Sequence, residues 1–227
     1  MILEKITMKD FRQFQGIQHI EFASETKSDG KNVTVIFGEN GRGKTGLFRA
    51  VVFALYGERR LSQDEEVQQK ELYLVNSVAM EDTKTYGKPV EAYVELIFQH
   101  KNEQYTIKRI LLGIFDRDER IEQPDQVTLS HTKTDGNTFT INDPEDIKKI
   151  INNILDKNVK EYFLFDGEKI QRLTLASIEQ KKEVAKGIKS LLNVDALEKA
   201  IKALQRLKKE LNTELSKRAT GEYAKIL

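Results

Sequence analysis

The opening of the chain alternates apolar and polar positions, which is the period of a strand with one buried face. Residues 2–8 and 17–22 both show this alternation, and they predict two antiparallel strands joined near residues 11–14. Lys101-Asn102 lies between two later apolar runs, where a hairpin turn is expected. The further predicted strands are Val90–Gln99, Glu103–Leu112, Gln126–His131 and a short Thr138–Ile141.

Apolar positions at helical spacing predict helices in two other places. Pro144, with acidic residues beside it, is typical of a first helical turn, and we expect a helix over residues 145–155. From Ser177 onward the chain lacks proline and is rich in Lys, Glu, Leu and Ala. A seven-residue spacing there predicts the start of a coiled coil, and an ordinary amphipathic surface helix is the alternative. The positions that carry this spacing are Leu197, Leu204 and Leu211, with Ile201, Lys208 and Leu215 offset from them, so a lysine interrupts the apolar pattern at one position.

A phosphate-binding loop is the strongest chemical signal. The apolar run Val33–Phe37 predicts a strand, Gly38-Glu-Asn-Gly-Arg-Gly-Lys-Thr45 follows, and a helix is predicted from Lys44 to Tyr56 with Gly57 as its C-cap. The glycines allow backbone N–H groups to converge on phosphate oxygens, and the helix N-terminus adds its positive end. In this motif Lys44 reaches the β- and γ-phosphates and the Thr45 hydroxyl ligates Mg²⁺. The loop therefore predicts binding of a nucleoside triphosphate.

Composition narrows the classes of partner. Lys and Arg total 37 against 36 Asp and Glu, so net charge predicts neither a nucleic acid nor a membrane as partner. The chain has no cysteine, which is in keeping with a reducing cytoplasm. The three histidines lie far apart in sequence, so we expect structural roles for them. No run approaches the roughly 20 apolar residues of a membrane span, and the N-terminus lacks a signal-peptide pattern.

Hydrolysis of the nucleotide needs, besides the phosphate-binding loop, a carboxylate that holds Mg²⁺, and the sequence allows two interpretations of where it lies. A metal-holding aspartate normally ends an apolar strand, and Tyr162–Phe165, followed by Asp166 and Glu168, is the one segment of that type. In one interpretation Asp166 is this Walker B aspartate and Glu168 is the general base. In the other, the chain is an N-terminal lobe whose Walker B strand and signature motif lie on a second lobe.

The motifs together resemble the N-terminal lobe of the SMC/Rad50-like ABC ATPases, and most of all the DndD family of DNA phosphorothioate (sulfur) modification ATPases. The Phe165-Asp-Gly-Glu168 stretch points to DndD in particular. The resemblance implies an α/β P-loop fold, with a mixed sheet whose antiparallel part surrounds the P-loop helix, over residues 1–176. It implies a helical coiled-coil stem over residues 177–227. The matching stretches are Ile6–Phe14, Val35–Thr45, Ala54–Gly57, Tyr162–Ile170 and Leu191–Glu198.

By the same resemblance, the site residues can be assigned. Lys44 and Asp166 are expected to be catalytic, and Thr45 and Asp166 to hold Mg²⁺. Asp166-Gly167 matches a turn that carries an amide in most relatives, and here a carboxylate stands in its place. Lys9 or Arg12 would approach the sugar or α-phosphate, and Arg59 and Arg60 would either sense DNA or a partner head or be solvated. The residues expected to bind ATP are Arg12, Asn40, Gly41, Arg42, Gly43, Lys44, Thr45 and Gly46.

The expected function is ATP binding with Mg²⁺ and ATP-dependent homodimerisation of heads. We expect slow turnover by this chain alone, because the C-terminal lobe of the same ATPase would complete the site. DNA, and other DNA sulfur-modification proteins, are expected partners, no membrane is expected, and the location is a bacterial or archaeal cytoplasm. Two alternatives remain open: a self-contained P-loop kinase or GTPase that uses Asp166, and a non-catalytic assembly module. The Asn-Lys-x-Asp box of GTPases has no match in the sequence.

Overall fold

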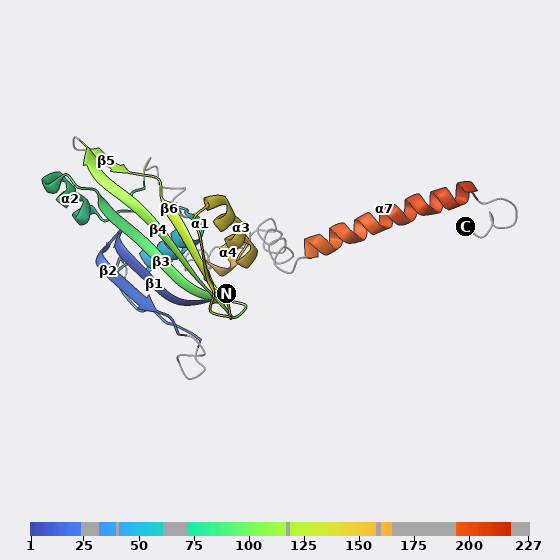
Figure 1. The fold of residues 1–227 in the computed structure, drawn as a ribbon, viewed down its shortest axis with the longest axis horizontal. Coiled ribbons are helices and arrows are strands. Elements are labelled where there is room, and N and C mark those ends of the chain that lie inside the picture. The colour runs from blue at the N-terminus through green and yellow to red at the C-terminus, as the bar shows by residue number, and fades with distance from the viewer. Residues whose placement is uncertain are drawn as a thin grey trace. The chain divides into compact units, whose positions relative to one another are not determined.

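Seven antiparallel strands form one sheet in the computed structural model, which describes residues 1–23, 32–39, 41–60, 72–116, 119–157, 160–164 and 194–218. The strand order is β2-β1-β3-β4-β6-β7, with β5 paired to β4 (Figure 1). The strands are β1 Ile2–Phe11, β2 Phe14–Glu21, β3 Val90–His100, β4 Glu103–Asp116, β5 Glu119–Glu122, β6 Gln126–Thr132 and β7 Thr138–Ile141. The predicted hairpins are confirmed, and β5 is an addition.

Turn chemistry sets the register of the β3–β4 hairpin. Lys101 and Asn102 have positive φ values of 52° and 64°, as a two-residue turn that matches strand twist requires. Pairing then runs without interruption from His100 opposite Glu103 to Val90 opposite Gly113. Because side chains alternate between the faces of a sheet, this register places one apolar set on the same side.

That apolar face forms the core. Alternate residues of four strands are buried on it, and α1 (Lys44–Tyr56) packs against β1, β3 and β4. Helix α3 (Pro144–Ile154) packs against β6 and α1, and α2 (Ser77–Tyr86) packs against β4 and β3. The most deeply buried side chains include Ile6 and Met8 of β1, Val94, Leu96 and Phe98 of β3, Ile107 and Leu111 of β4, and Leu129 of β6.

Local signals begin and end these helices. Gly57 caps α1 with a φ of 69°, and its N–H donates to the Phe53 carbonyl, as predicted. The Asp143 side chain accepts from the N–H groups of Glu145 and Asp146 at the start of α3. Asn76 caps α2 in the same way through Val78 and Ala79. Both side-chain caps satisfy donors that a helix leaves free in its first turn.

The two predicted strands next to chemical motifs are not formed. Residues 32–39 are irregular, and no described strand pairs with Val33–Phe37. A strand needs a neighbour for its backbone groups, so an apolar run without one does not become a strand. Lys160–Phe163 is helix α4, which makes the strand predicted over Tyr162–Phe165 wrong for Tyr162 and Phe163. A short apolar run has no periodicity long enough to separate the two structures.

The chain divides into two compact units, Met1–Lys160 and Glu161–Leu227. The second contains α7, Val194–Arg218, which confirms a helix where heptad spacing was found. Leu197, Leu204 and Leu211 are exposed on it by 61%, 65% and 51%. The coiled coil itself stays a prediction, and so does the boundary at residues 176–177, which lies outside the described residues. Among the described residues, no helix has the length and apolar character to cross a membrane.

Glu58, just after α1, joins this helix to residues near α4 through a charged cluster. Its carboxylate contacts Lys157 Nζ at 3.1 Å and also Lys160 Nζ, and the Tyr56 hydroxyl donates to the Leu155 carbonyl at 2.9 Å. Burial opposes ionisation of Glu58, but hydrogen bonds and charge from the two lysines outweigh it and lower its pKa below the ordinary 4.5. Burial, with the charges of Glu58 and Asp156, raises the pKa of Tyr56 and keeps it a neutral donor.

This cluster predicts a pH-dependent stability. A carboxylate with a lowered pKa stabilises the fold above its unfolded pKa of 4.5, and this contribution is lost as pH falls through the lower folded value. We expect Glu58→Gln to cost about 1 kcal/mol at pH 7, with the gap to wild type closing below pH 4.5. Urea unfolding at pH 7 and pH 3.5 measures it. Glu119→Gln, at an exposed glutamate of β5, is the control and should show no gap; an equal gap at both pH values for Glu58→Gln would contradict the assignment.

Candidate nucleotide-binding site

The predicted phosphate-binding loop precedes α1 directly. Gly41 and Gly43 have φ values of 82° and 99°, a left-handed conformation that side chains with a Cβ resist. Gly43 occupies the N-cap position of α1, and no side chain caps this end of the helix. The first backbone N–H groups of α1 thus remain suited to an anion, and the binding of one there stays a prediction.

The Lys44 side chain folds back over the phosphate-binding loop. Its Nζ donates to the carbonyl oxygens of Gly38 at 2.5 Å and Glu39 at 2.9 Å. The side chain is exposed, so these two contacts orient the ammonium group without burying it. A phosphate oxygen is a stronger, charged acceptor than a carbonyl, so an anion in the loop would compete for this group.

The remaining predicted site residues that the structure describes differ in exposure and in contacts. Thr45 is exposed at the start of α1, and Gly46 is buried beneath it. Arg42 forms an exposed ion pair with Glu39, at 3.3 Å between Nε and Oε2. Asn40 and Asp166 lie outside the described residues, as does Glu168, so their assigned roles stay predictions. Within the described residues, no three histidine or acidic side chains cluster as metal ligands.

Contacts near the C-terminus of α1 fix this helix to the sheet and so position the phosphate-binding loop at its N-terminus. Phe53 of α1 stacks on Phe11 of β1 with ring centroids 5.6 Å apart, and both rings are fully buried. Arg109 of β4 donates through Nε to the Ala54 carbonyl at 2.9 Å and through Nη1 to Asp125 at 2.6 Å. Burial lowers the pKa of Arg109, while the carboxylate of Asp125 opposes that shift. These contacts tie the P-loop helix to β1 and β4 at once.

Arg12, predicted from the resemblance to approach the nucleotide, lies in the turn after β1. Its Nη1 donates to the Tyr73 carbonyl at 3.2 Å, and its φ is 53°. The next residue, Gln13, donates through Nε2 to the Gly43 carbonyl at 3.3 Å. The structure therefore brings the β1–β2 turn to the phosphate-binding loop, which lies some 30 residues later in the chain. Sequence analysis missed Gln13, because nothing in a single polar residue of a turn signals a contact with a distant loop.

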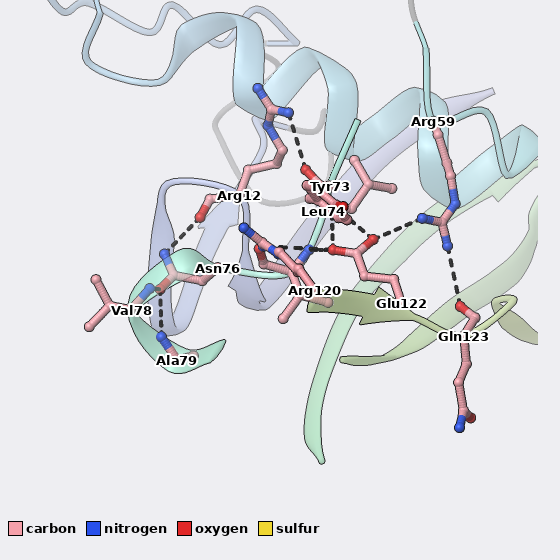
Figure 2. Close-up of polar contacts among 11 residues, drawn as sticks. Arg12, Arg59, Tyr73, Leu74, Asn76, Val78, Ala79, Arg120, Glu122 and Gln123 are labelled. Atoms are coloured by element: carbon pink, nitrogen blue, oxygen red, sulfur yellow. Dashed lines mark hydrogen bonds and ion pairs between the residues drawn. The ribbon is translucent and has the colours of Figure 1, made fainter. Parts of the chain in front are cut away.

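Arg59 has a structural partner. Its Nη1 donates to Glu122 Oε2 at 2.8 Å and its Nη2 to the Gln123 carbonyl at 3.3 Å (Figure 2). Because this partner carboxylate is only 2% exposed, Arg59 is not a plain solvated charge, and its role as a sensor of DNA or a partner head stays a prediction. Glu122 was also missed, because the short charged strand β5 has no apolar alternation to reveal it.

The fold and the loop together define a P-loop α/β domain with an antiparallel sheet. A family model described as "AAA domain" matches residues 5–225 of the chain. The chain belongs to this AAA-domain family. The predicted resemblance to SMC/Rad50-like ATPase heads is confirmed at this coarser level.

Curated relatives are similar over most of the chain. The DNA double-strand break repair Rad50 ATPase of Methanocaldococcus jannaschii is 28% identical over 226 residues, which cover 98% of this chain and 18% of that protein. The SbcC component of the nuclease SbcCD from Treponema pallidum is 24% identical over 91% of this chain, again 18% of the relative. The chain thus spans about a fifth of the length of these relatives.

Two solved structures are similar as well. An Smc head domain with a coiled coil and joint from Pyrococcus yayanosii is 19% identical, covers 96% of this chain and 39% of its own, and has a TM-score of 0.43. A chain from a study of ATP-driven dimerization and DNA-stimulated activation of SMC ATPases is 18% identical, covers 83% of this chain and 99% of its own, and has a TM-score of 0.44.

Proposed function

We propose that this chain binds ATP with Mg²⁺ at the Gly38–Thr45 loop as the N-terminal lobe of an SMC/Rad50-like ATPase. The observation that carries the proposal is Lys44, whose Nζ lies over the loop at 2.5 Å from the Gly38 carbonyl. The loop runs directly into α1, whose first N–H groups have no side-chain cap. A triphosphate satisfies both the ammonium group and these donors.

The residues present fit a magnesium nucleotide. Thr45 is exposed at the first turn of α1, where a hydroxyl can ligate a hard cation. Asp166 would supply a carboxylate ligand, and Arg12 would contact the sugar or α-phosphate. Bound Mg²⁺ would neutralise charge that develops on the phosphates during hydrolysis.

A second lobe completes the site in this proposal. Val33, Val35 and Phe37, directly before the loop, are exposed by 73%, 63% and 91%, and no described strand pairs with them. An apolar run of this kind is suited to pairing inside a sheet rather than to water. The C-terminal lobe of the same ATPase would provide the partner strand and the Walker B carboxylate. ATP would then hold two heads together as a homodimer until hydrolysis releases them.

The biological setting is proposed from the relatives. One is named as a DNA double-strand break repair ATPase and another as a nuclease subunit, so DNA is the expected partner of the assembled protein. Within this group the Phe165-Asp-Gly-Glu168 stretch supports a DndD-like role in DNA phosphorothioate modification, together with other proteins of that system.

Calorimetry with ATP and with GTP in the presence of Mg²⁺ tests the proposal. We expect ATP to bind and the chain alone to hydrolyse it very slowly. Strict preference for GTP would support the kinase or GTPase alternative, and loss of all nucleotide binding would support a non-catalytic assembly module. Rapid turnover by the chain alone that disappears in Asp166→Ala would assign Asp166 to the Walker B role instead.

A further inference from the structure

Gln13 joins the β1–β2 turn to the phosphate-binding loop. Besides donating to the Gly43 carbonyl, its amide lies directly over Gly46 in the first turn of α1. A Cβ on Gly46 would lie only 1.7 Å from Gln13 Nε2, so the amide occupies the space that any side chain at residue 46 would need. The hydrogen bond from the Gln13 amide to the Gly43 carbonyl thus connects the turn to the backbone of the loop.

The same turn is held from its other side by the segment Tyr73–Asn76. The Arg12 N–H donates to the Leu74 carbonyl at 2.6 Å, and the Asn76 side-chain amide donates to the Arg12 carbonyl at 2.7 Å. Arg12 has a φ of 53°, which is unfavourable for a residue with a Cβ and persists where neighbouring contacts impose it. Four hydrogen bonds between this segment and the turn impose it here: the two just given, Asn76 N–H to the Asp10 carbonyl at 2.7 Å, and Arg12 Nη1 to the Tyr73 carbonyl at 3.2 Å.

Glu122 in turn holds the Tyr73–Asn76 segment. Its carboxylate accepts from the Leu74 N–H at 2.8 Å and the Val75 N–H at 2.7 Å (Figure 2). Arg59 pairs with it at 2.8 Å and Arg120 at 3.7 Å, and only 2% of its side chain is exposed. A buried carboxylate with this many donors is held in one geometry, because any displacement would leave charge without a partner.

A continuous series of contacts therefore runs from β5 to the nucleotide loop: Glu122, the Tyr73–Asn76 segment, the Arg12–Gln13 turn, and Gly43. We propose that Glu122 is a positioning residue of the nucleotide site, acting through Gln13 on the backbone of the phosphate-binding loop. The inference rests on the proposed function, since the loop must bind a triphosphate for its position to matter. Neither Glu122 nor Gln13 touches the anion in this scheme.

The physical effect is preorganisation. Loop amides that are already aimed at the phosphates lose less conformational entropy on binding than amides that must be ordered by the ligand. Removing these contacts leaves Lys44 and the glycines in place but lets the loop sample other positions. The expected result is a moderate loss of affinity rather than the large loss that follows removal of Lys44.

The test measures affinity for ATP with Mg²⁺ by calorimetry on the full chain. Because a single hydrogen bond contributes about 0.5–1.5 kcal/mol, we expect Gln13→Ala and Glu122→Gln each to weaken binding by roughly threefold to tenfold. The matched control is Glu119→Gln, an exposed glutamate on the same strand, which should bind as wild type does. Wild-type affinity in Glu122→Gln would overturn the proposal.

A double substitution separates positioning from general weakening of the fold. If Glu122 acts through Gln13, Glu122→Gln should cause no further loss in a Gln13→Ala background. Losses that multiply would show that Glu122 only stabilises the domain, and would contradict the inference.

Two further measurements keep the outcomes distinct. If Glu122→Gln loses its folded circular dichroism spectrum, Arg59→Gln replaces it, because Arg59 is 32% exposed and its loss leaves Glu122 paired with Arg120 and the backbone. A smaller loss of affinity, again absent in the Gln13→Ala background, is then expected, and multiplying losses would again contradict the inference. Absence of ATP binding by wild type would refute the proposed function itself, whereas wild-type binding with an unaffected Glu122→Gln would refute only the positioning role.

Discussion

Lys44→Ala is expected to reduce the affinity for ATP with Mg²⁺ by at least roughly 100-fold. The substitution removes the two charge-assisted contacts that we propose between the Lys44 ammonium group and the β- and γ-phosphates, each contributing about 1.5–3 kcal/mol. Lys44 Nζ lies within 2.9 Å of both the Gly38 and Glu39 carbonyls, over the loop in which we propose that the β- and γ-phosphates bind. Removing a single exposed lysine leaves the apolar core unchanged, so the fold should be retained. Calorimetry gives the affinity, and circular dichroism confirms the fold.

Lys148→Ala is the matched control for that experiment. Lys148 lies on α3 and forms an exposed ion pair with Glu145 at 3.3 Å, so its removal should leave ATP binding as in wild type. Undiminished ATP binding by Lys44→Ala would mean that the Gly38–Thr45 loop does not hold the phosphates. The proposed function would then have to be abandoned.

Phe53→Ala is expected to lower the free energy of unfolding by about 3–5 kcal/mol, the usual cost of deleting a fully buried aromatic ring. Phe53 is 0% exposed and stacks on Phe11, so the substitution leaves a cavity between α1 and β1. A loss of this size is a large part of the roughly 5–15 kcal/mol that stabilises an ordinary domain. Urea unfolding followed by circular dichroism measures it.

The comparison for this prediction is Phe139→Ala on β7. Phe139 is 50% exposed, so its removal should change stability by less than about 1 kcal/mol. If the two substitutions cost the same, α1 would not be packed on β1 as described. Because α1 follows the phosphate-binding loop directly, the apparent ATP affinity of Phe53→Ala should also fall under conditions in which part of the variant is unfolded.

Most of the sheet could be predicted because its signals are local. Alternation of apolar and polar side chains identified β1 and β2, apolar runs identified β3 and β4, and Lys101-Asn102 between them adopts the positive φ values of a hairpin turn. Gly57 ends α1 and Pro144 begins α3, where glycine's conformational freedom and the fixed φ of proline predicted. Each of these features depends on residues within a few positions of one another, so a single sequence contains the information.

Contacts between distant segments could not be predicted in the same way. Glu122 binds the backbone of Leu74 and Val75 across 48 and 47 residues, and Gln13 reaches Gly43 across 30. Neither residue belongs to a motif, and strand β5 is short and charged. The Val33–Phe37 prediction failed for a related reason, since an apolar run becomes a strand when a partner supplies hydrogen bonds, and no described strand does so.

The sequence by itself determined the phosphate-binding loop, the helix that follows it and the antiparallel strands, because glycine placement, capping residues and alternation act over a few residues. Only the tertiary structure decided that the β1–β2 turn contacts this loop and that the buried Glu122 binds the backbone of the Tyr73–Asn76 segment, which contacts the turn. Those arrangements depend on which distant segments meet when the sheet packs on α1, where Phe11 and Phe53 are buried against each other, and a local pattern does not specify them.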